Sequence, residues 1–125
     1  MIFLRKWKEY MENSKIKQLK LDFKQYLIRS YPNIANTTIQ TYLRDAFYVY
    51  RHNSEFNIDF FDLFKNRQTI DTFEKELFDN QKSKYNIIYP KSSTKAYMNG
   101  LYRLYNFFED VYGGINNFIN SKILQ

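Results

Sequence analysis

The chain has 125 residues, a length typical of one domain and sufficient to bury a core without metal or disulfide support. It contains no cysteine, three glycines and two prolines, which excludes thiolate metal sites, disulfide frameworks and β folds that need many turns. Nineteen Lys and Arg against thirteen Asp and Glu give a net charge of +6, which favours a polyanionic partner. We therefore expect an all-α domain whose core is largely aromatic, because the chain holds 12 Phe and 12 Tyr.

Two helices are predicted in the first thirty residues. The first covers residues 2–12 and carries an apolar stripe of Phe3, Trp7 and Tyr10, which either packs on its own domain or anchors a partner. The second lies near residues 17–30 and ends where a proline follows, since proline disfavours helix at the residue before it. Its inner face consists of Leu19, Phe23, Tyr26 and Leu27.

The third helix has the clearest periodicity and begins at Asn36 or Thr37, either of which is a suitable N-cap. Its expected core face consists of Ile39, Tyr42, Leu43, Ala46, Phe47 and Tyr50. The other side presents Gln40, Thr41, Arg44, Tyr48 and Arg51. Because the two arginines are seven residues apart, we expect them to lie on the same side of the helix and to make its polar side basic.

Short elements connect this helix to the last one. One turn of helix is expected after Asp59 as cap, and another after Asp71 as cap, with Phe73, Leu77 and Phe78 turned inward. Residues 83–93 contain three β-favouring side chains, Ile87, Ile88 and Tyr89, but the run is too short and too isolated to form a sheet, so we expect an extended loop there.

The last strong helix is predicted to open after Ser92 and Ser93 and to run through Tyr112, where Gly113 and Gly114 stop it. Its inner stripe consists of Tyr97, Leu101, Leu104, Tyr105, Phe108 and Val111. The final residues add a small apolar set of Ile115, Phe118, Ile119 and Leu124.

Residues suited to catalysis are scarce. His52 is the only histidine, and Asp59 with Asp62 is more typical of helix capping than of a metal site. Glycine-rich phosphate loops and metalloprotease motifs are absent. We therefore expect no enzyme, no metal, no cofactor and no small-molecule substrate. The chain also lacks an apolar run of membrane-spanning length and a signal peptide, so a soluble, cytoplasmic protein is expected.

The two strong helices share one organisation, with a Ser/Thr-rich entry, an apolar inner side and a polar outer side. The entries read NTTIQTYLRDAFYVY and SSTKAYMNGLYRLYNFF. Helix N-termini and adjacent hydroxyls bind phosphate, and four cations would add charge-assisted contacts. These cations are Arg44, Lys91, Lys95 and Arg103. The same pattern also arises when hydroxyl caps begin helices and cations solvate their outer side, and this alternative stays open.

The stretch from Leu19 to Tyr112 resembles the N-terminal core-binding domain of tyrosine recombinases and phage integrases. That family implies a compact SAM-like bundle of four to five helices that clamps duplex DNA, with catalysis supplied by a separate downstream domain. By this resemblance, the DNA-binding residues are Thr37, Thr38, Thr41 and Arg44 in one entry, and Ser92, Ser93, Thr94, Lys95 and Arg103 in the other. The chain departs from the family in lacking the catalytic domain and in its extra helix at residues 2–12.

The expected organisation is a single helical domain over residues 1–125. It consists of an N-terminal helix at 1–16, a core-binding-like bundle at 17–112 and an extension at 113–125. The first functional hypothesis is a non-catalytic DNA-binding module. The alternative is a small phage or mobile-element protein that binds another protein, or a second copy of itself, through the aromatic stripe of Phe3, Trp7 and Tyr10.

Overall fold

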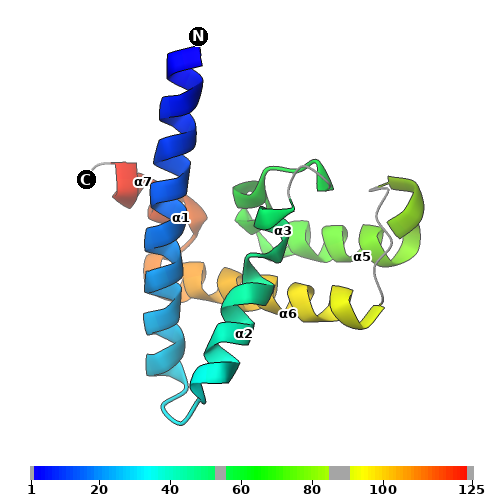
Figure 1. Cartoon of the computed structure of the whole chain (residues 1–125). Helices are drawn as coiled ribbons and strands as arrows, with labels where there is room; N and C mark the ends of the chain where they lie inside the picture. The colour runs from blue at the N-terminus through cyan, green and yellow to red at the C-terminus, as the bar shows by residue number, and fades with distance from the viewer. Residues whose placement is uncertain (1, 53–55, 85–90, 124–125) are drawn as a thin grey trace. The chain divides into compact units, whose positions relative to one another are not determined.

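The computed structural model describes the backbone of residues 2–52, 56–84 and 91–123, and the side chains of residues 14–52, 56–78 and 93–121. These residues form helices and no strand, which confirms the all-α prediction (Figure 1). The elements are α1 (Ile2–Ser30), α2 (Asn36–Ala46), α3 (Tyr48–Arg51), the 3₁₀ helix η1 (Phe60–Phe64), α5 (Arg67–Lys84), α6 (Lys91–Phe107), the π-helix η2 (Phe108–Tyr112) and α7 (Ile115–Ile123). Packing divides the chain into two compact units, Met1–Ile39 and Gln40–Gln125. The single domain expected over residues 1–125 stays a prediction.

One continuous helix, α1, replaces the two helices predicted over residues 2–12 and 17–30 (Figure 1). The expected break near residue 16 is wrong because no glycine or proline lies within α1. Asn13 and Ser14 each cost only about 0.5 kcal/mol relative to alanine in a helix interior. The predicted end is confirmed, since α1 stops at Ser30, two residues before Pro32. Its buried stripe is formed by Ile16, Leu19, Phe23 and Leu27, with Tyr26 half-buried.

The third predicted helix begins at Asn36 as expected, but it is interrupted at Phe47. There φ is −106° and ψ is 12°, and a turn separates α2 from α3. The side chain of Phe47 is fully buried, and its ring centre lies 5.9 Å from that of Phe60. We attribute the interruption of the helix to this packing, which cannot be predicted from the helical periodicity of the sequence. The predicted core face is otherwise buried or half-buried along its length.

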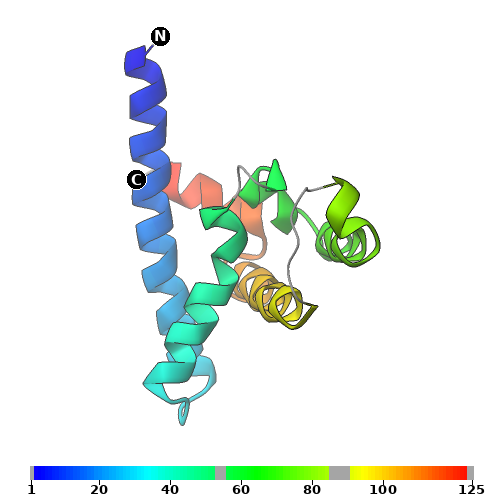
Figure 2. The ribbon, with the colours of Figure 1, turned by 45° about the vertical axis from the view of Figure 1, so that its right-hand side comes forward.

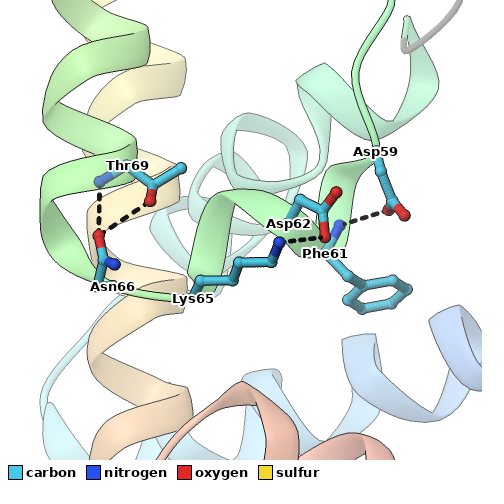
Figure 3. Close-up of polar contacts among 6 residues, drawn as sticks. All are labelled: Asp59, Phe61, Asp62, Lys65, Asn66 and Thr69. Atoms are coloured by element: carbon cyan, nitrogen blue, oxygen red, sulfur yellow. Dashed lines mark hydrogen bonds and ion pairs between the residues drawn. The ribbon is translucent and has the colours of Figure 1, made fainter.

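Of the two caps predicted for the connecting helices, one is confirmed and one is wrong (Figure 3). Asp59 caps η1, where its Oδ1 accepts a hydrogen bond from the backbone N–H of Phe61 at 3.1 Å. Asp71 is not a cap, because α5 begins four residues earlier. Asn66 takes that role, and its Oδ1 accepts from the backbone N–H of Thr69 at 2.8 Å. Phe73 and Leu77 are buried as predicted, and Phe78 is half-buried.

The extended loop expected over residues 83–93 lies mainly outside the described residues, which exclude 85–90. Residues 83–84 belong to α5 and residues 91–93 to α6, so the helices reach further into this stretch than expected. The two helices run side by side in opposite directions (Figures 1 and 2). They place a polar cluster, described below, at their contact.

The predicted stop at Gly113 is confirmed, because this residue has φ 76° in the left-handed conformation that ends helices. Before it, residues 108–112 form a π-turn, whose i→i+5 bonds rotate the side chains away from an α-helical register. Val111, predicted to face inward, is therefore 43 % exposed. Ile115 and Phe118 of α7 are buried as expected, whereas Leu124 lies outside the described residues.

An aromatic core holds unit Gln40–Gln125 together, as the composition predicts. Ring contacts run from Phe47 to Phe60, from Phe60 to Phe64, from Phe64 to Phe108, and from Phe108 to Phe118, with centre distances of 5.1 to 5.9 Å. Edge-to-face and tilted arrangements of this kind add to the free energy gained by burying the rings. This core fixes the ends of α3, η1, η2 and α7 relative to one another.

Candidate functional site

The second half of α2 crosses α6 in close contact at Gly100. A Cβ atom on this residue would lie 2.5 Å from the backbone nitrogen of Ala46 and 2.6 Å from the carbonyl carbon of Asp45, so the crossing requires glycine. Three residues further along α6, the guanidinium carbon of Arg103 lies 3.9 Å from the centre of the Tyr42 ring. This cation–π contact holds a predicted site residue of α6 against α2.

The predicted site residues of α2 differ in exposure. Thr37 and Arg44 are exposed, whereas Thr38 and Thr41 are half-buried. The side chain of Arg44 is 66 % exposed, and its Nε lies 3.7 Å from Oδ1 of Asp45. An exposed ion pair of this kind contributes about 0–1 kcal/mol, so it holds Arg44 weakly.

Arg51 joins this part of the surface, although it was not among the predicted site residues. Its Nη2 donates a hydrogen bond to the backbone carbonyl oxygen of Arg44 at 3.0 Å. This carbonyl belongs to the last turn of α2, where helix carbonyls lack partners within the helix. Tyr48, beneath Arg51 at 5.8 Å, stacks in turn on Tyr97 of α6 with ring centres 4.8 Å apart. The seven-residue spacing from Arg44 was the sequence signal for Arg51.

The entry to α6 contributes fewer accessible groups than predicted. Ser93 and Lys95 are exposed, but Thr94 is fully buried. Burial raises the pKa of Tyr97, and a hydrogen bond with the Thr94 side chain opposes this shift. The Thr94 side chain is therefore part of the packed interior of the fold. Lys91 and Ser92 belong to the first turn of α6, and their side chains lie outside the described ones.

Charge is segregated within the unit Gln40–Gln125. Residues 40–51 and 91–103, the segments that meet at Gly100, hold five Lys and Arg against one Asp. The remainder, residues 52–90 and 104–125, holds six Lys and Arg against nine Asp and Glu. The net charges are thus +4 and −3. We call residues 40–51 and 91–103 the cationic region.

A polar cluster links Tyr102 of α6 to the start of α5. The hydroxyl of Tyr102 donates a hydrogen bond to Oδ1 of Asp71, and it lies 3.3 Å from Oε1 of Glu74. The guanidinium carbon of Arg67 lies 5.2 Å from the centre of the Tyr102 ring. Burial, followed by the hydrogen bond to Asp71, raises the pKa of Tyr102 well above its ordinary value. The phenol is thereby kept protonated and acts as a fixed donor.

Tyr102→Phe is expected to lower the free energy of unfolding by about 1.5 kcal/mol near neutral pH, because one hydrogen bond to a charged acceptor is lost. The pKa in the folded state is raised, so the unfolded chain releases this proton first, from about pH 10 upward. Stability from this group is therefore full below about pH 10 and declines above it. The difference between wild type and variant should shrink in urea unfolding followed by circular dichroism at about pH 11 compared with about pH 8.

Tyr105→Phe is the matched control, since it removes the same hydroxyl from another half-buried position of α6. It should lower stability less at neutral pH. An equal gap between wild type and Tyr102→Phe at both pH values would contradict the assignment of the raised pKa to this cluster.

A cleft of about 610 Å³ lies beside η1 and the start of α5. Phe56, Leu63 and Phe73 form its apolar part, and Glu76 is the one ionisable residue among the described residues that line it. Asn66 and Thr69, whose hydrogen bond caps the start of α5 (Figure 3), also line it. Across the described residues, no group of three His, Cys, Asp or Glu side chains is placed to hold a metal ion.

Comparison of the chain with protein-family models, with characterised proteins and with solved structures finds no match. Among the described helices, none combines the length and the apolar character needed to cross a bilayer.

Proposed function

We propose that the protein binds duplex DNA without acting on it chemically, through the cationic region. The observation that carries this proposal is the charge segregation between segments: the two that meet at the crossing of α2 and α6 hold five Lys and Arg against one Asp. DNA presents a regular array of phosphates, and binding of Lys and Arg releases the counterions condensed on it. Within the unit Gln40–Gln125, a region of net charge +4 and a remainder of −3 would orient this unit on such a polyanion.

Individual side chains of the cationic region have different parts in this proposal. Arg44 and Lys95 are exposed and can reach phosphate oxygens, and the hydroxyl of Ser93 lies in the first turn of α6. Arg103 stacks one face on Tyr42, and the edge of a stacked guanidinium still carries its N–H donors. Contacts of this type position a protein on DNA with little dependence on base sequence.

The resemblance to integrase core-binding domains agrees with this proposal, because that family clamps DNA with the corresponding helix entries and leaves catalysis to another domain. We propose no strand-transfer activity for the residues of this chain. A role on duplex DNA also fits the cytoplasmic location expected from the sequence. The experiment that tests the proposal measures affinity as a function of salt.

The protein should bind a fluorescein-labelled mixed-sequence duplex, with affinity that falls steeply between about 50 and 200 mM salt in anisotropy titrations. Arg44→Gln/Lys95→Gln should reduce the slope of log K against log salt by about two, since each phosphate contact contributes roughly one. The matched control Lys65→Gln/Lys75→Gln removes two exposed cations outside the cationic region and should leave the slope unchanged. Absence of binding at the lower salt, or equal slopes for both double variants, would refute the proposal.

A further inference from the structure

The outer side of α1 carries a second surface, separate from the cationic region. Leu21, Ile28 and Tyr31 are 58 %, 40 % and 49 % exposed, although large apolar side chains are usually buried. Lys17 precedes Leu21, Lys24 lies between Leu21 and Ile28, and Tyr31 directly follows the last residue of α1. These five residues follow one another at intervals of four, three, four and three, so they form a single line. We call this line the outer seam.

Alternating intervals of three and four are the spacing of a coiled-coil seam, in which one helix lays a narrow stripe against another. The buried residues Leu19, Phe23 and Leu27 occupy the other side of α1, so the outer seam does not belong to the core of this unit. From Lys17 to Tyr31 the seam extends about 21 Å, at 1.5 Å per residue.

The same spacing continues toward the start of α1. In the sequence register, Phe3, Trp7, Tyr10 and Ser14 precede Lys17 at intervals of four, three, four and three. α1 is continuous from Ile2, so these positions share its register with the outer seam. The side chains of Phe3, Trp7 and Tyr10, the predicted partner-binding stripe, lie outside the described ones. The argument for the seam rests on residues 17–31.

Charge decides which occupant fits the outer seam. Residues 1–39 hold eight Lys and Arg against three Asp and Glu, a net charge of +5. A second copy aligned in parallel would place Lys17 and Lys24 against themselves, and like charges at a seam disfavour pairing. Duplex DNA would complement the lysines, but it would leave Leu21 and Ile28 against phosphates. An acidic amphipathic helix complements both kinds of residue, because it offers apolar side chains to Leu21 and Ile28 and carboxylates to the lysines.

We propose that the outer seam docks an acidic amphipathic helix of another protein. Apolar residues of that helix would pack on Leu21, Ile28 and Tyr31, and its carboxylates would face Lys17 and Lys24. This is helix-on-helix recognition, in which apolar anchors supply affinity and the charges select the partner. The outer seam shares no residue with the proposed DNA contacts at Arg44 and Lys95.

The test uses a labelled designed peptide of about two heptads, the length of the outer seam, with Leu opposite the apolar seam residues and Glu opposite the lysines and in the flanking positions. The protein should bind this acidic peptide with micromolar affinity in anisotropy titrations, and a Lys-for-Glu version of the peptide should not bind. Leu21→Ser/Ile28→Ser should weaken binding at least about tenfold, because two apolar anchors are lost. Val111→Ser, which removes an exposed apolar side chain outside α1, is the matched control and should not change it.

Charge reversal provides the second variant. Lys17→Glu/Lys24→Glu should abolish binding of the acidic peptide and create binding of the Lys-for-Glu peptide, while thermal unfolding stays as in the wild type. Equal binding of both peptides, or of neither, would overturn the proposal. Three other occupants of the seam would also overturn it. A second copy is indicated by a concentration-dependent dimer in sedimentation that Leu21→Ser/Ile28→Ser abolishes. Duplex DNA is indicated if it displaces the peptide from Arg44→Gln/Lys95→Gln as well, and a membrane is indicated if anionic lipid vesicles displace the peptide.

Discussion

Gly100→Ala is expected to lower the free energy of unfolding by about 1–3 kcal/mol, the usual cost of forcing extra atoms into a packed site. The added methyl group would meet the backbone of Asp45 and Ala46, at 2.5 to 2.8 Å, rather than a side chain that could rotate away. On an open helix surface the same change would stabilise by about 1 kcal/mol, because alanine favours helix over glycine. A loss of stability in Gly100→Ala, rather than a gain, would therefore show that α2 and α6 are in contact at this residue. Urea unfolding followed by circular dichroism measures it.

Asn99→Ala is the control for Gly100→Ala, because it adds a better helix former at the neighbouring, exposed position of α6. This variant should be as stable as the wild type or slightly more stable. If Gly100→Ala were equally well tolerated, α2 and α6 would not be in contact at this point. DNA affinity should fall together with the stability of Gly100→Ala, because the crossing also brings the two halves of the cationic region together.

Helix ends could be predicted from the sequence wherever a residue constrains the backbone by itself. Pro32 follows the end of α1, and Gly113 ends the helical run after α6, both as predicted. Asp59 caps η1 for the same reason, since its carboxylate needs only the next two residues. In these cases the decisive interaction lies within a few residues of the chain.

Predictions failed where contacts distant in sequence decide the geometry. The turn at Phe47 accompanies the packing of its ring on Phe60. The exposure of Val111 follows from a π-turn, whereas the prediction assumed α-helical spacing. Asp71 has the sequence signature of a cap, yet it accepts a hydrogen bond from Tyr102, thirty-one residues away. At Phe47 and Asp71, a contact distant in sequence therefore overrides the local rule.

The same distinction applies to the candidate site. The sequence identified Arg44 and Lys95 as outward-facing cations, and both are exposed. It could not show that Thr94 is buried against the interior or that Arg103 stacks on Tyr42, because Tyr42 lies on another helix. Arg51 was visible only as a residue seven positions after Arg44, and its hydrogen bond to the Arg44 carbonyl depends on the turn at Phe47.

Phe60→Ala is expected to have the largest effect on stability, a loss of about 3–5 kcal/mol. The Phe60 side chain is buried, and its ring lies 5.1 to 5.9 Å from the rings of Phe47, Tyr50, Phe61 and Phe64. Truncation would remove the buried area of one ring and leave a cavity that these neighbours line. Because small domains are stable by only about 5–15 kcal/mol, the variant would be partly unfolded at 37 °C.

Two companion variants make this expectation measurable even if Phe60→Ala does not fold. Phe60→Leu keeps most of the buried volume and should unfold cooperatively in urea with a loss of about 1.5 kcal/mol or less. Phe61→Ala truncates the adjacent, half-buried ring and should cost less than Phe60→Ala, because part of that ring is already in water. Equal losses for the two alanine variants would mean that Phe60 is not a centre of the aromatic core. In that case the packing of Phe47 on Phe60 could not account for the turn between α2 and α3, and another cause would be required for it.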